Sequence, residues 1–511
     1  MSAALSPDLK VLVVGAGAMG SGIAQVAAAA GHTVYLYDSR AEAADQGRAG
    51  IVAALDKLAA KGRMSAEAAQ AAAARVLPVS ELGAARDAGL VVEAIVEDLA
   101  VKRALFAELE GLLGADAILA SNTSSLSITA LAAPLARPGR VAGLHFFNPA
   151  PVMKLVEVVS GLATDTEVAD ALHATARAWG KVAVHAKSTP GFIVNRVARP
   201  YYAEALRVLG EGAADVATLD AVLREGCGFP MGPFELMDLI GHDVNFAVTS
   251  SVFDAYFQDK RFTPSLIQQE LVLAGRLGRK SGRGFYDYAE GAARPLPATE
   301  AAQQGETMVA VVGDLGVAGA LIARLEAAGI AVQRKPGSSA HGAGWLEIGG
   351  ARLVLSDGRT ATRRAAEEGV PNLVLFDLCL DYATTPRLTL AVAEQCGTGA
   401  WRAVAGTLQA AGLAVTRVDD VAGLVGLRTV AMLANEAADA VLAGIGSAAD
   451  IDTAMRFGTN YPKGPLAWAD EIGVASVARV LANLAAHYFD TRYRTSPLLQ
   501  RKAITGASFH E

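Results

Sequence analysis

Residues 423–473 repeat residues 191–241 without a gap, at a constant offset of 423 − 191 = 232. Identity held in one register indicates an internal duplication, whereas two helical bundles of independent origin would share no register. The chain must therefore fold so that it accommodates two related helical domains. The identical pairs include Arg196/Arg428, Glu204/Glu436, Asp220/Asp452, Gly226/Gly458, Pro230/Pro462, Gly232/Gly464, Pro233/Pro465, Asp238/Asp470 and Gly241/Gly473.

A strand–turn–helix–strand pattern precedes each helical repeat. The apolar run Lys10–Val14 leads into Gly15, and after a helical stretch residues 33–38 have the composition of a second strand. Residues 307–333 show the same pattern around Gly313, at an offset of 313 − 15 = 298. The second copy therefore lacks 298 − 232 = 66 residues before its helical domain. Further alternation of strands and helices predicts a parallel sheet with helices on both faces.

The length of 511 residues exceeds what one hydrophobic core can organise, so about three or four domains are expected. After Pro190 the pattern is helical, and an Ala/Pro-rich stretch without periodicity is the best linker candidate. We expect an α/β Rossmann domain over 1–188, an all-helical domain over 189–288, a linker over 289–305, a degenerate, shortened Rossmann-like domain over 306–420 and a second all-helical domain over 421–505.

Composition and charge exclude several classes of function. The net charge of −7 is spread along the chain without a basic stripe, so we expect no nucleic-acid partner. Cys227, Cys379 and Cys396 have no metal-ligand spacing, and such sparse use of cysteine suits a reducing cytosol. No signal peptide and no membrane-spanning run is visible. We therefore expect a cytoplasmic protein with no membrane association and no metal site.

The first glycine turn has the spacing of a dinucleotide-binding motif. Gly15, Gly17 and Gly20 follow a strand and open a helix, and Asp38 lies at the end of the second strand. Pyrophosphate would bind at the helix N-terminus, and Asp38 would accept a hydrogen bond from a ribose 2′-hydroxyl. NAD is therefore favoured over NADP. Arg40 could still bind the 2′-phosphate of NADP, or it could be an ordinary solvated arginine.

The second glycine turn has lost this character. Leu315 and Ala318 replace two of its glycines, and Asp314 brings a carboxylate to the place where a pyrophosphate would lie. We expect that this half does not bind a dinucleotide.

Residues 143–157 (GLHFFNPAPVMKLVE) hold a histidine and a glutamate suited to acid–base chemistry. A carboxylate beside His145 would stabilise the imidazolium that forms when the ring accepts a proton. Taken alone, His145 could be a buried structural histidine, and Glu157 could face water or pair with Lys154. Residues 121–128 (SNTSSLSI) end a strand and are either a capping turn or a wall of the same pocket, since ligands bind at the carboxyl ends of parallel strands.

Six segments in order carry a resemblance to the L-3-hydroxyacyl-CoA dehydrogenase family. They are the glycine turn 15–20, VVEAIVEDLAVK (91–102), SNTSS (121–125), GLHFFNPAPVMKLVEV (143–158), GFIVNR (191–196) and GRKSGRGFYDY (278–288). The resemblance implies a Rossmann domain followed by a helical domain of the 6-phosphogluconate-dehydrogenase-like type. The duplicated layout is similar to the long bacterial members, several of which serve phenylacetate degradation as 3-hydroxyadipyl-CoA dehydrogenases, whereas others act on 3-hydroxybutyryl-CoA or in fatty-acid β-oxidation.

The resemblance implies a role for each site residue. His145 would remove the proton of the 3-hydroxyl, Glu157 would orient His145, and Ser124 and Asn195 would hydrogen-bond the reacting oxygen. The cofactor would be NAD and the substrate an acyl-CoA, with Lys61 near the CoA phosphates. Residues implied around the cofactor are Gly15, Gly17, Gly20, Asp38, Glu97, Lys102, Asn148 and Lys280.

The repeat serves as an internal control on these assignments. At the offset of 232, His145 falls on Asp377, Glu157 on Thr389, Asn195 on Leu427 and Ser124 on Ser356, although the register before about residue 388 is less secure. We expect one active site per chain, between the first Rossmann domain and the domain 189–288. Relatives with one helical domain use it to dimerise, so residues 421–490 should pack on 189–288 as an internal pseudo-dimer, and a homodimer through another surface is possible.

Two alternative functions stay open at this point. One is a Rossmann dehydrogenase that acts on a sugar acid such as L-gulonate, and the other is a non-enzymatic NAD-binding or structural protein. An enzyme is favoured, because a protein that no longer catalyses a reaction tends to lose its catalytic side chains. Here these side chains are intact: His145, Glu157, Ser124 and Asn195.

Overall fold

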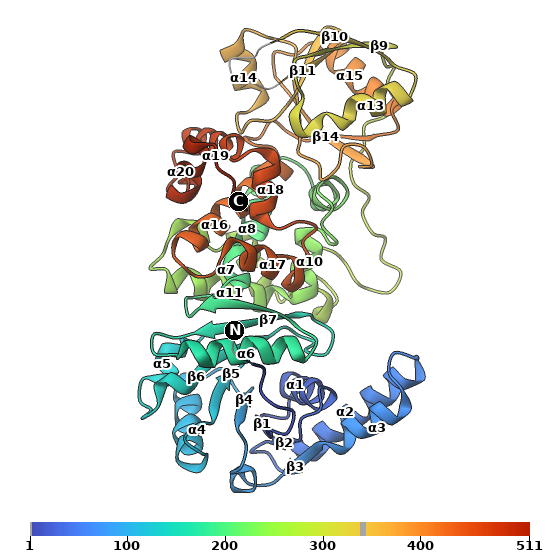
Figure 1. Ribbon diagram of the computed structural model, residues 1–511. Helices are drawn as coiled ribbons and strands as arrows, with labels where there is room; N and C mark the ends of the chain where they lie inside the picture. The colour runs from blue at the N-terminus through green and yellow to red at the C-terminus, as the bar shows by residue number, and fades with distance from the viewer. Residues whose placement is uncertain (1–2, 338–343, 511) are drawn as a thin grey trace. The chain divides into compact units, whose positions relative to one another are not determined.

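The computed structural model describes residues 3–337 and 344–510, and its internal contacts divide the chain into two units (Figure 1). Unit 1 comprises Met1–Arg196 and Ala443–Thr459, and unit 2 comprises Val197–Leu442 and Asn460–Glu511. The segment Ala443–Thr459 belongs to the second helical repeat, so the units do not follow the order of the sequence.

Unit 1 is built on an eight-stranded sheet with the order β3-β2-β1-β4-β5-β6-β7-β8. Its strands are β1 (Val11–Val14), β2 (Val34–Tyr37), β3 (Val76–Val79), β4 (Leu90–Glu93), β5 (Ile118–Ser121), β6 (Val141–Phe146), β7 (Leu155–Ser160) and β8 (Val182–Lys187). Its helices are α1 (Ala18–Ala29), α2 (Ala43–Ala60), α3 (Ala66–Ala74), α4 (Leu99–Leu112), α5 (Ile128–Ala132), α6 (Thr166–Ala178), α7 (Val194–Val197) and α17 (Ala448–Gly458), with short turns η1 (Leu82–Ala85) and η2 (Pro138–Arg140).

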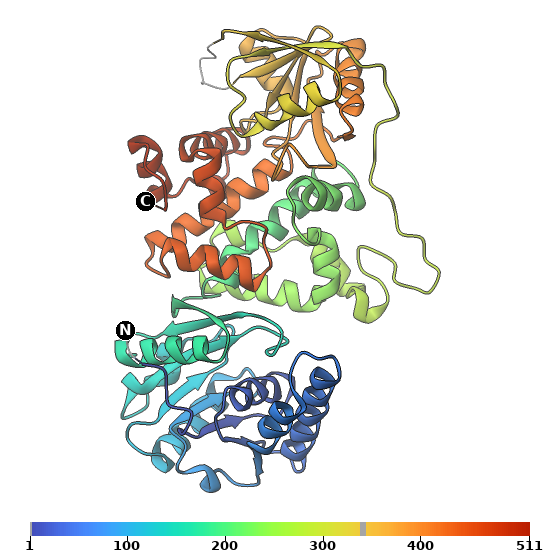
Figure 2. The same cartoon turned by 45° about the vertical axis from the view of Figure 1, so that its right-hand side comes forward.

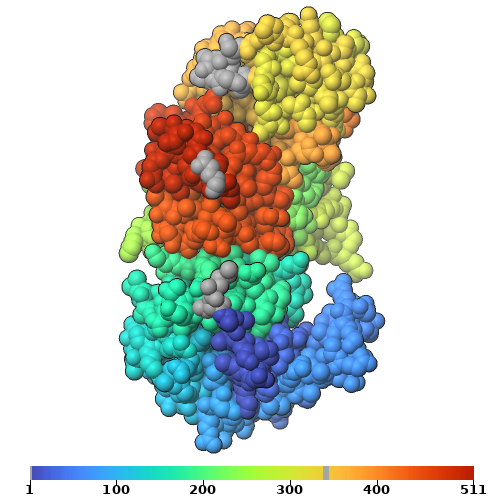
Figure 3. Space-filling model, viewed as in Figure 1, coloured from blue at the N-terminus to red at the C-terminus, as the bar shows by residue number. Residues whose placement is uncertain are grey.

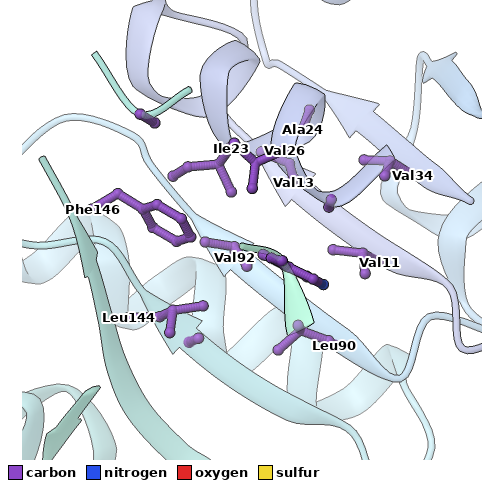
Figure 4. Packing of buried hydrophobic residues seen from close by; sticks show 14 of the residues in the cluster. Val11, Val13, Ile23, Ala24, Val26, Val34, Leu90, Val92, Leu144 and Phe146 are labelled. Carbon is purple, nitrogen blue, oxygen red and sulfur yellow. The ribbon is translucent and has the colours of Figure 1, made fainter. Parts of the chain in front are cut away.

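The strands of unit 1 are nearly continuous apolar runs because helices cover the sheet on both sides. Figure 4 shows Val11, Val13 and Val92 of the sheet packed against Ile23 and Val26 of α1. All of these side chains are buried. The strands expected near residues 10–14, 33–38, 89–95 and 117–122 are confirmed.

The sheet of unit 1 is parallel, as expected, except at one pair of strands. β6 and β7 run antiparallel, with His145 directly opposite Glu157, whereas the other paired strands of this sheet are parallel. The connection between β6 and β7, residues 147–154, is too short for the crossover that a parallel pair requires.

The long helical stretch before β3 forms a hairpin of α2 and α3, which stands out from the sheet of unit 1 (Figures 1 and 3). The expected break near Gly62 is confirmed, because Gly62 has a φ of +65° and follows the last turn of α2. Ser65 then caps α3 by accepting a hydrogen bond from the Ala68 N–H.

Unit 2 contains a seven-stranded sheet with the order β10-β9-β11-β12-β13-β14-β15. The strands are β9 (Met308–Val312), β10 (Ala331–Lys335), β11 (Trp345–Ile348), β12 (Ala351–Leu355), β13 (Leu373–Phe376), β14 (Arg387–Val392) and β15 (Ala414–Arg417). β11 runs antiparallel to β9 where the first sheet has a parallel neighbour. Gly349 and Gly350, both with positive φ, then form the two-residue turn from β11 to β12.

The helices of unit 2 are α8 (Arg199–Gly210), α9 (Val216–Ala221), α10 (Pro233–Ile240), α11 (His242–Ala255), α12 (Leu266–Leu273), α13 (Ala320–Ala327), α14 (Ala361–Glu368), α15 (Thr398–Ala410), α16 (Gly426–Leu442), α18 (Pro465–Ile472), α19 (Val474–Tyr488) and α20 (Pro497–Thr505). Short turns are η3 (Val222–Gly226), η4 (Lys260–Phe262), η5 (Arg279–Ser281), η6 (Gly316–Ala318) and η7 (Thr491–Tyr493). None of the helices in the described part of the chain combines the length and the apolar character that crossing a membrane requires.

The two helical repeats pack against each other through equivalent helices. α8 of the first repeat contacts α16 of the second, as expected for the packing of 421–490 on 189–288. Tyr493 of η7 donates a hydrogen bond to Glu204, while Arg261 of the equivalent turn η4 pairs with Glu436, the counterpart of Glu204. Such reciprocal contacts are typical of a two-fold interface.

Each helical repeat also supplies a segment to the sheet of the other copy. In unit 1, α17 of the second repeat packs on β7 and β8. In unit 2, the equivalent turn η3 of the first repeat packs on β14, where Glu225 pairs with Arg387 at 2.8 Å. This exchange explains why the two units cut across the order of the sequence.

The segment 289–305 forms no helix or strand and runs along unit 2 as an extended trace (Figure 2). From Ala298 onward the segment is hydrogen-bonded to neighbouring residues of unit 2. The Ala298 N–H donates to Thr218 Oγ1 and the Glu300 N–H donates to the Val415 carbonyl, each at 2.8 Å. The expected linker therefore includes residues that are held by hydrogen bonds within unit 2.

Candidate active site

A buried histidine–glutamate pair lies at the end of β6 and in β7. His145 Nδ1 and Glu157 Oε2 are 2.6 Å apart, and Glu157 is fully buried. The alternatives in which Glu157 faces water or pairs with Lys154 are therefore wrong. The antiparallel register of β6 and β7 places the two side chains on the same face of the sheet, so the backbone itself forms the pair.

The second oxygen of Glu157 holds the start of the next helix. Glu157 Oε1 accepts hydrogen bonds of 3.0 Å from the N–H groups of Ile193 and Val194, at the N-terminus of α7. These amides carry partial positive charge and favour a carboxylate. Asn195 follows in the same turn, so Glu157 fixes both the ring of His145 and the backbone that carries Asn195.

Two phenylalanines flank the imidazole ring. The ring centroid of Phe147 lies 4.5 Å from that of His145, and the ring of Phe192 lies 5.8 Å away in an edge-on arrangement. His145 is 5% exposed. The ring therefore has little rotational freedom and little contact with solvent, and its Nδ1 is committed to Glu157.

The serine-rich segment after β5 is tied to the neighbouring strands. Glu97 accepts hydrogen bonds from Thr123 Oγ1 at 2.5 Å, from Ser125 Oγ at 3.0 Å and from the Ser124 N–H at 3.2 Å. Asn122 Oδ1 accepts from the Phe146 N–H at 2.8 Å, which links the segment to β6 beside His145. β5 and β6 are adjacent parallel strands, so Ser124 and His145 lie at the same edge of the sheet.

Lys102 is enclosed by two carboxylates. Its side chain is 1% exposed, and Nζ lies 2.5 Å from Glu93 Oε1 and 3.2 Å from Glu97 Oε2. Glu93 also accepts a 2.6 Å hydrogen bond from Ser121 Oγ. Sequence reasoning missed Glu93, and only its position at the carboxyl end of β4 could have indicated it. Lys102 therefore holds Glu97, and through it the serine-rich segment.

The first glycine turn has room for a dinucleotide. Gly15 has a φ of +103°, and a Cβ at Gly20 would lie 1.8 Å from the Gly15 carbonyl oxygen, so both positions require glycine. A Cβ at Gly17 would meet nothing within 4 Å. Gly17 is the N-cap of α1 and offers no capping side chain, so the first N–H groups of α1 stay available to a phosphate.

Asp38 ties the glycine turn to the end of β2. Its Oδ2 accepts a 2.8 Å hydrogen bond from the Ala16 N–H, and both carboxyl oxygens accept from the Arg40 guanidinium at 3.0 and 3.1 Å. Arg40 lowers the pKa of the Asp38 carboxyl to about 2, so the group is ionised. Arg40 is 71% exposed but is paired, which refines its interpretation as a solvated arginine.

Three other candidates, Lys61, Asn148 and Lys280, lie outside the strands that carry the pair. Lys61 is exposed at the C-terminal end of α2, and Asn148 is exposed in the turn after β6. Lys280 belongs to unit 2, where its Nζ pairs with Asp243 at 2.6 Å.

Among the described residues, the second copy has no equivalent pair. The register of β13 and β14 places Asp377 opposite Thr389, as the offset of 232 predicts. Asp377 instead accepts hydrogen bonds from the N–H groups of Val425, Gly426 and Leu427 at the start of α16. Burial raises the pKa of the Asp377 carboxyl to about 6, and these N–H groups oppose the shift. A carboxylate therefore still caps the helix, from the strand that carries the histidine in the first copy.

One register assignment is wrong by one residue. The pairing of β12 with β13 places Arg352 beside Leu373, whereas β5 with β6 places Leu119 beside Val141. The offset in this strand is therefore 352 − 119 = 233, so Ser124 corresponds to Asp357 and not to Ser356. The second copy has therefore lost 298 − 233 = 65 residues before β12, and one more residue between β12 and β13.

The chain belongs to the 3-hydroxyacyl-CoA dehydrogenase family. Residues 10–189 match the model of the NAD-binding domain of 3-hydroxyacyl-CoA dehydrogenase, and residues 191–288 and 423–508 both match the C-terminal domain. Residues 353–421 match the reduced Rossmann-fold domain of 3-hydroxybutyryl-CoA dehydrogenase. The chain is thus an oxidoreductase with an NAD-binding Rossmann domain, which decides against the sugar-acid and non-enzymatic alternatives.

Particular relatives match over nearly the whole length. The 3-hydroxyadipyl-CoA dehydrogenase of Escherichia coli K12 is 46% identical over 98% of both chains. The crystal structure of a 3-hydroxybutyryl-CoA dehydrogenase from the same organism has a TM-score of 0.88, covering 98% of this chain and 99% of that one. The mitochondrial hydroxyacyl-coenzyme A dehydrogenase of Sus scrofa is 43% identical over 54% of this chain and 90% of its own.

We expect the change Gly17→Ala to weaken NAD binding while leaving the fold intact. The added methyl group has room in the protein but occupies the approach of the pyrophosphate, so the Kd for NAD should rise by roughly 10- to 100-fold. Titration calorimetry measures this directly. Gly111→Ala, the same change in α4 with equal room for the methyl, is the control. An unchanged Kd in Gly17→Ala would show that the phosphates bind elsewhere.

Proposed function

We propose that this chain oxidises the 3-hydroxyl group of an L-3-hydroxyacyl-CoA to a ketone with NAD, using His145 as the base. The buried pair of His145 and Glu157 supports this proposal most directly, because Nδ1 is engaged by the carboxylate and Nε2 is left to exchange a proton. The pair lies at the strand edge of the domain that matches NAD-binding relatives.

The protein residues move one proton and hold one oxygen. His145 Nε2 accepts the proton of the 3-hydroxyl while Nδ1–H donates to Glu157, which stabilises the imidazolium that results. Ser124 and Asn195 donate hydrogen bonds to the substrate oxygen as it becomes a carbonyl. When bound, NAD would supply the acceptor for the hydride of C3. The products are the 3-oxoacyl-CoA, NADH and one proton.

The residues around the cofactor follow from the same assignment. Gly15, Gly17 and Gly20 form the turn for the pyrophosphate, and Asp38 accepts a hydrogen bond from the ribose. Glu97, Asn148 and Lys280 complete the surroundings of the cofactor, Lys102 acts by holding Glu97, and Lys61 binds the CoA phosphates. The second Rossmann-like segment binds no dinucleotide, since Leu315 and Ala318 are buried in its core.

We expect the acyl group of the substrate to be of the kind on which the long bacterial relatives act. One of these is named for 3-hydroxyadipyl-CoA and another for 3-hydroxybutyryl-CoA, so the substrate is a short 3-hydroxyacyl-CoA from aromatic or fatty-acid degradation, in the cytoplasm. NADH absorbance with a panel from 3-hydroxybutyryl-CoA to 3-hydroxyhexadecanoyl-CoA, plus 3-hydroxyadipyl-CoA, tests the proposal. L-Gulonate is the negative control.

The contact between the helical repeats acts as an internal dimer interface, and we expect it to hold the chain together after a cut in the linker. A protease site inserted between Gly291 and Ala292 lies before Ala298, the residue at which the segment 289–305 becomes hydrogen-bonded to unit 2. After cleavage, both fragments should elute together in size-exclusion chromatography, because α8 packs on α16 and α17 packs on β7 and β8. Separation into two folded halves without denaturant would contradict the internal dimer.

A further inference from the structure

Two phenylalanines at equivalent positions of the helical repeats are almost fully exposed. Phe257 follows α11 and Phe489 follows α19, at an offset of 489 − 257 = 232, and both belong to unit 2. Their exposed fractions are 91% and 92%. A single exposed apolar side chain is common in proteins and needs no explanation, but exposure of the same aromatic side chain in both copies does.

The backbone at both phenylalanines is left-handed, with a φ of +53° at Phe257 and +50° at Phe489. Helices commonly end on a residue in this conformation, but glycine or asparagine usually takes the position, because a Cβ atom is strained there. Both repeats therefore hold a phenylalanine where the local backbone favours a smaller residue.

The two phenylalanines persist although the helices that precede them have diverged. Of the sixteen residues 242–257, only three are identical to their counterparts in 474–489. Side chains retained against such divergence usually have a structural or a binding role. The identical pairs are Val248/Val480, Tyr256/Tyr488 and Phe257/Phe489.

Packing within the fold accounts for the tyrosines but not for the phenylalanines. The ring centroid of Tyr256 lies 4.9 Å from that of Phe262, and the ring centroid of Tyr488 lies 5.1 Å from that of Tyr493. Each tyrosine therefore packs on the turn that follows its helix. The phenylalanine that comes next is exposed in both copies, so its retention points to a contact outside the chain.

The turns that follow the two phenylalanines meet at the contact between the repeats. η4 and η7 contact each other, and Asp439 of α16 pairs both with Arg261 of η4 and with Arg494, next to η7. Because η4 and η7 are equivalent turns, the two-fold axis of the internal dimer passes between them. Positions related by a two-fold axis lie at the same height along it, so Phe257 and Phe489 belong to the same end of the helical pair.

The arginines of both turns already have carboxylate partners. Arg261 pairs with Asp259 and Arg492 pairs with Asp490, each at 2.7 Å. A partner protein could therefore cover them without leaving a buried charge unpaired. Lys260, the other cation of η4, is exposed and can keep its ammonium group in water through its long side chain.

We propose that Phe257 and Phe489 anchor a second copy of this chain, which docks through the same end of its own helical pair. Aromatic side chains are typical anchors at the centre of an interface. A surface with two equivalent anchors is matched by a partner that also presents two, and a second copy related by a two-fold axis presents the same pair. The surface adjoins the contact between the repeats, so the new contact would continue the internal dimer interface. This inference concerns assembly and does not depend on the proposed function.

Replacement of the phenylalanines by glycine tests the proposal, because glycine adopts the positive φ and preserves the ends of α11 and α19. Sedimentation equilibrium of the full chain measures the Kd of the pair of chains. Each phenylalanine occurs twice in a two-fold pair, so Phe257→Gly or Phe489→Gly alone should raise this Kd by roughly 10- to 100-fold. The double variant should have the mass of one chain.

Leu296→Gly is the matched control, because it removes an apolar side chain that is 85% exposed elsewhere in unit 2. Its Kd should equal that of the wild type. A wild-type chain that stays single at every concentration, or a double variant that pairs as tightly as the wild type, would overturn the proposal. Growth of the wild type beyond two chains would also contradict it, because a two-fold contact closes at the pair.

Discussion

Replacement of His145 by glutamine is expected to lower turnover by at least ~10²-fold, because the base that accepts the 3-hydroxyl proton is removed. Glutamine fills a similar volume and can still bond to Glu157 Oε2, so the fold should persist. The glycine turn and Asp38 are untouched, so the Kd for NAD should stay within about twofold. Steady-state kinetics on 3-hydroxybutyryl-CoA and calorimetry with NAD measure both quantities.

The control for this variant is His185→Gln, the same change at a half-exposed histidine that pairs with Asp170 in unit 1. Its turnover should equal that of the wild type. If His145→Gln also kept near-normal turnover, His145 would not be the base.

Much of unit 1 could be predicted from apolar periodicity and the glycine turn. Strands such as Val11–Val14 and Leu90–Glu93 are buried on both faces and therefore appear in the sequence as continuous apolar runs. The antiparallel direction of β7 could not be predicted in this way, because hydrophobic periodicity carries no information about strand direction. That direction is what places Glu157 opposite His145.

The active-site pair could be predicted from its motif, but its supporting residues could not. Glu93 and Asn122 bond to groups 9 to 28 residues away along the chain, and such partners are chosen by the tertiary fold. The same limit explains why the counterpart of Ser124 was assigned one residue too early. A shift of one residue in β12, next to a large deletion, changes nothing in the local sequence pattern that could reveal it.

The repeat separates the two tasks of Glu157, because the second copy retained one of them. Asp377 caps α16 as Glu157 caps α7, yet no histidine in the described part of the chain pairs with Asp377. The cap is therefore needed for folding in both copies, while orientation of an imidazole is needed only in the first. A substitution at Glu157 that keeps the cap and removes the charge should affect catalysis alone.

Glu157→Gln is such a substitution, and we expect it to lower turnover by ~10³-fold or more with little change in thermal stability. The glutamine Oε1 can still accept from Ile193 and Val194, but an Nε2 facing His145 Nδ1 would force the ring proton onto Nε2, the wrong tautomer for a base. The imidazolium would also lose its counter-ion. Kinetics and thermal unfolding on the same preparation separate the two effects.

The internal control for Glu157→Gln is Asp377→Ala, which removes the cap of the second copy. It should destabilise the protein by ~3 kcal/mol or more, because several buried N–H groups lose their acceptor, and it should leave kcat unchanged at a temperature where the protein is folded. If Glu157→Gln instead lost thermal stability but kept the turnover of the wild type at a temperature where it is folded, the Glu157 carboxylate would serve the fold alone. His145 would then work without a charged partner.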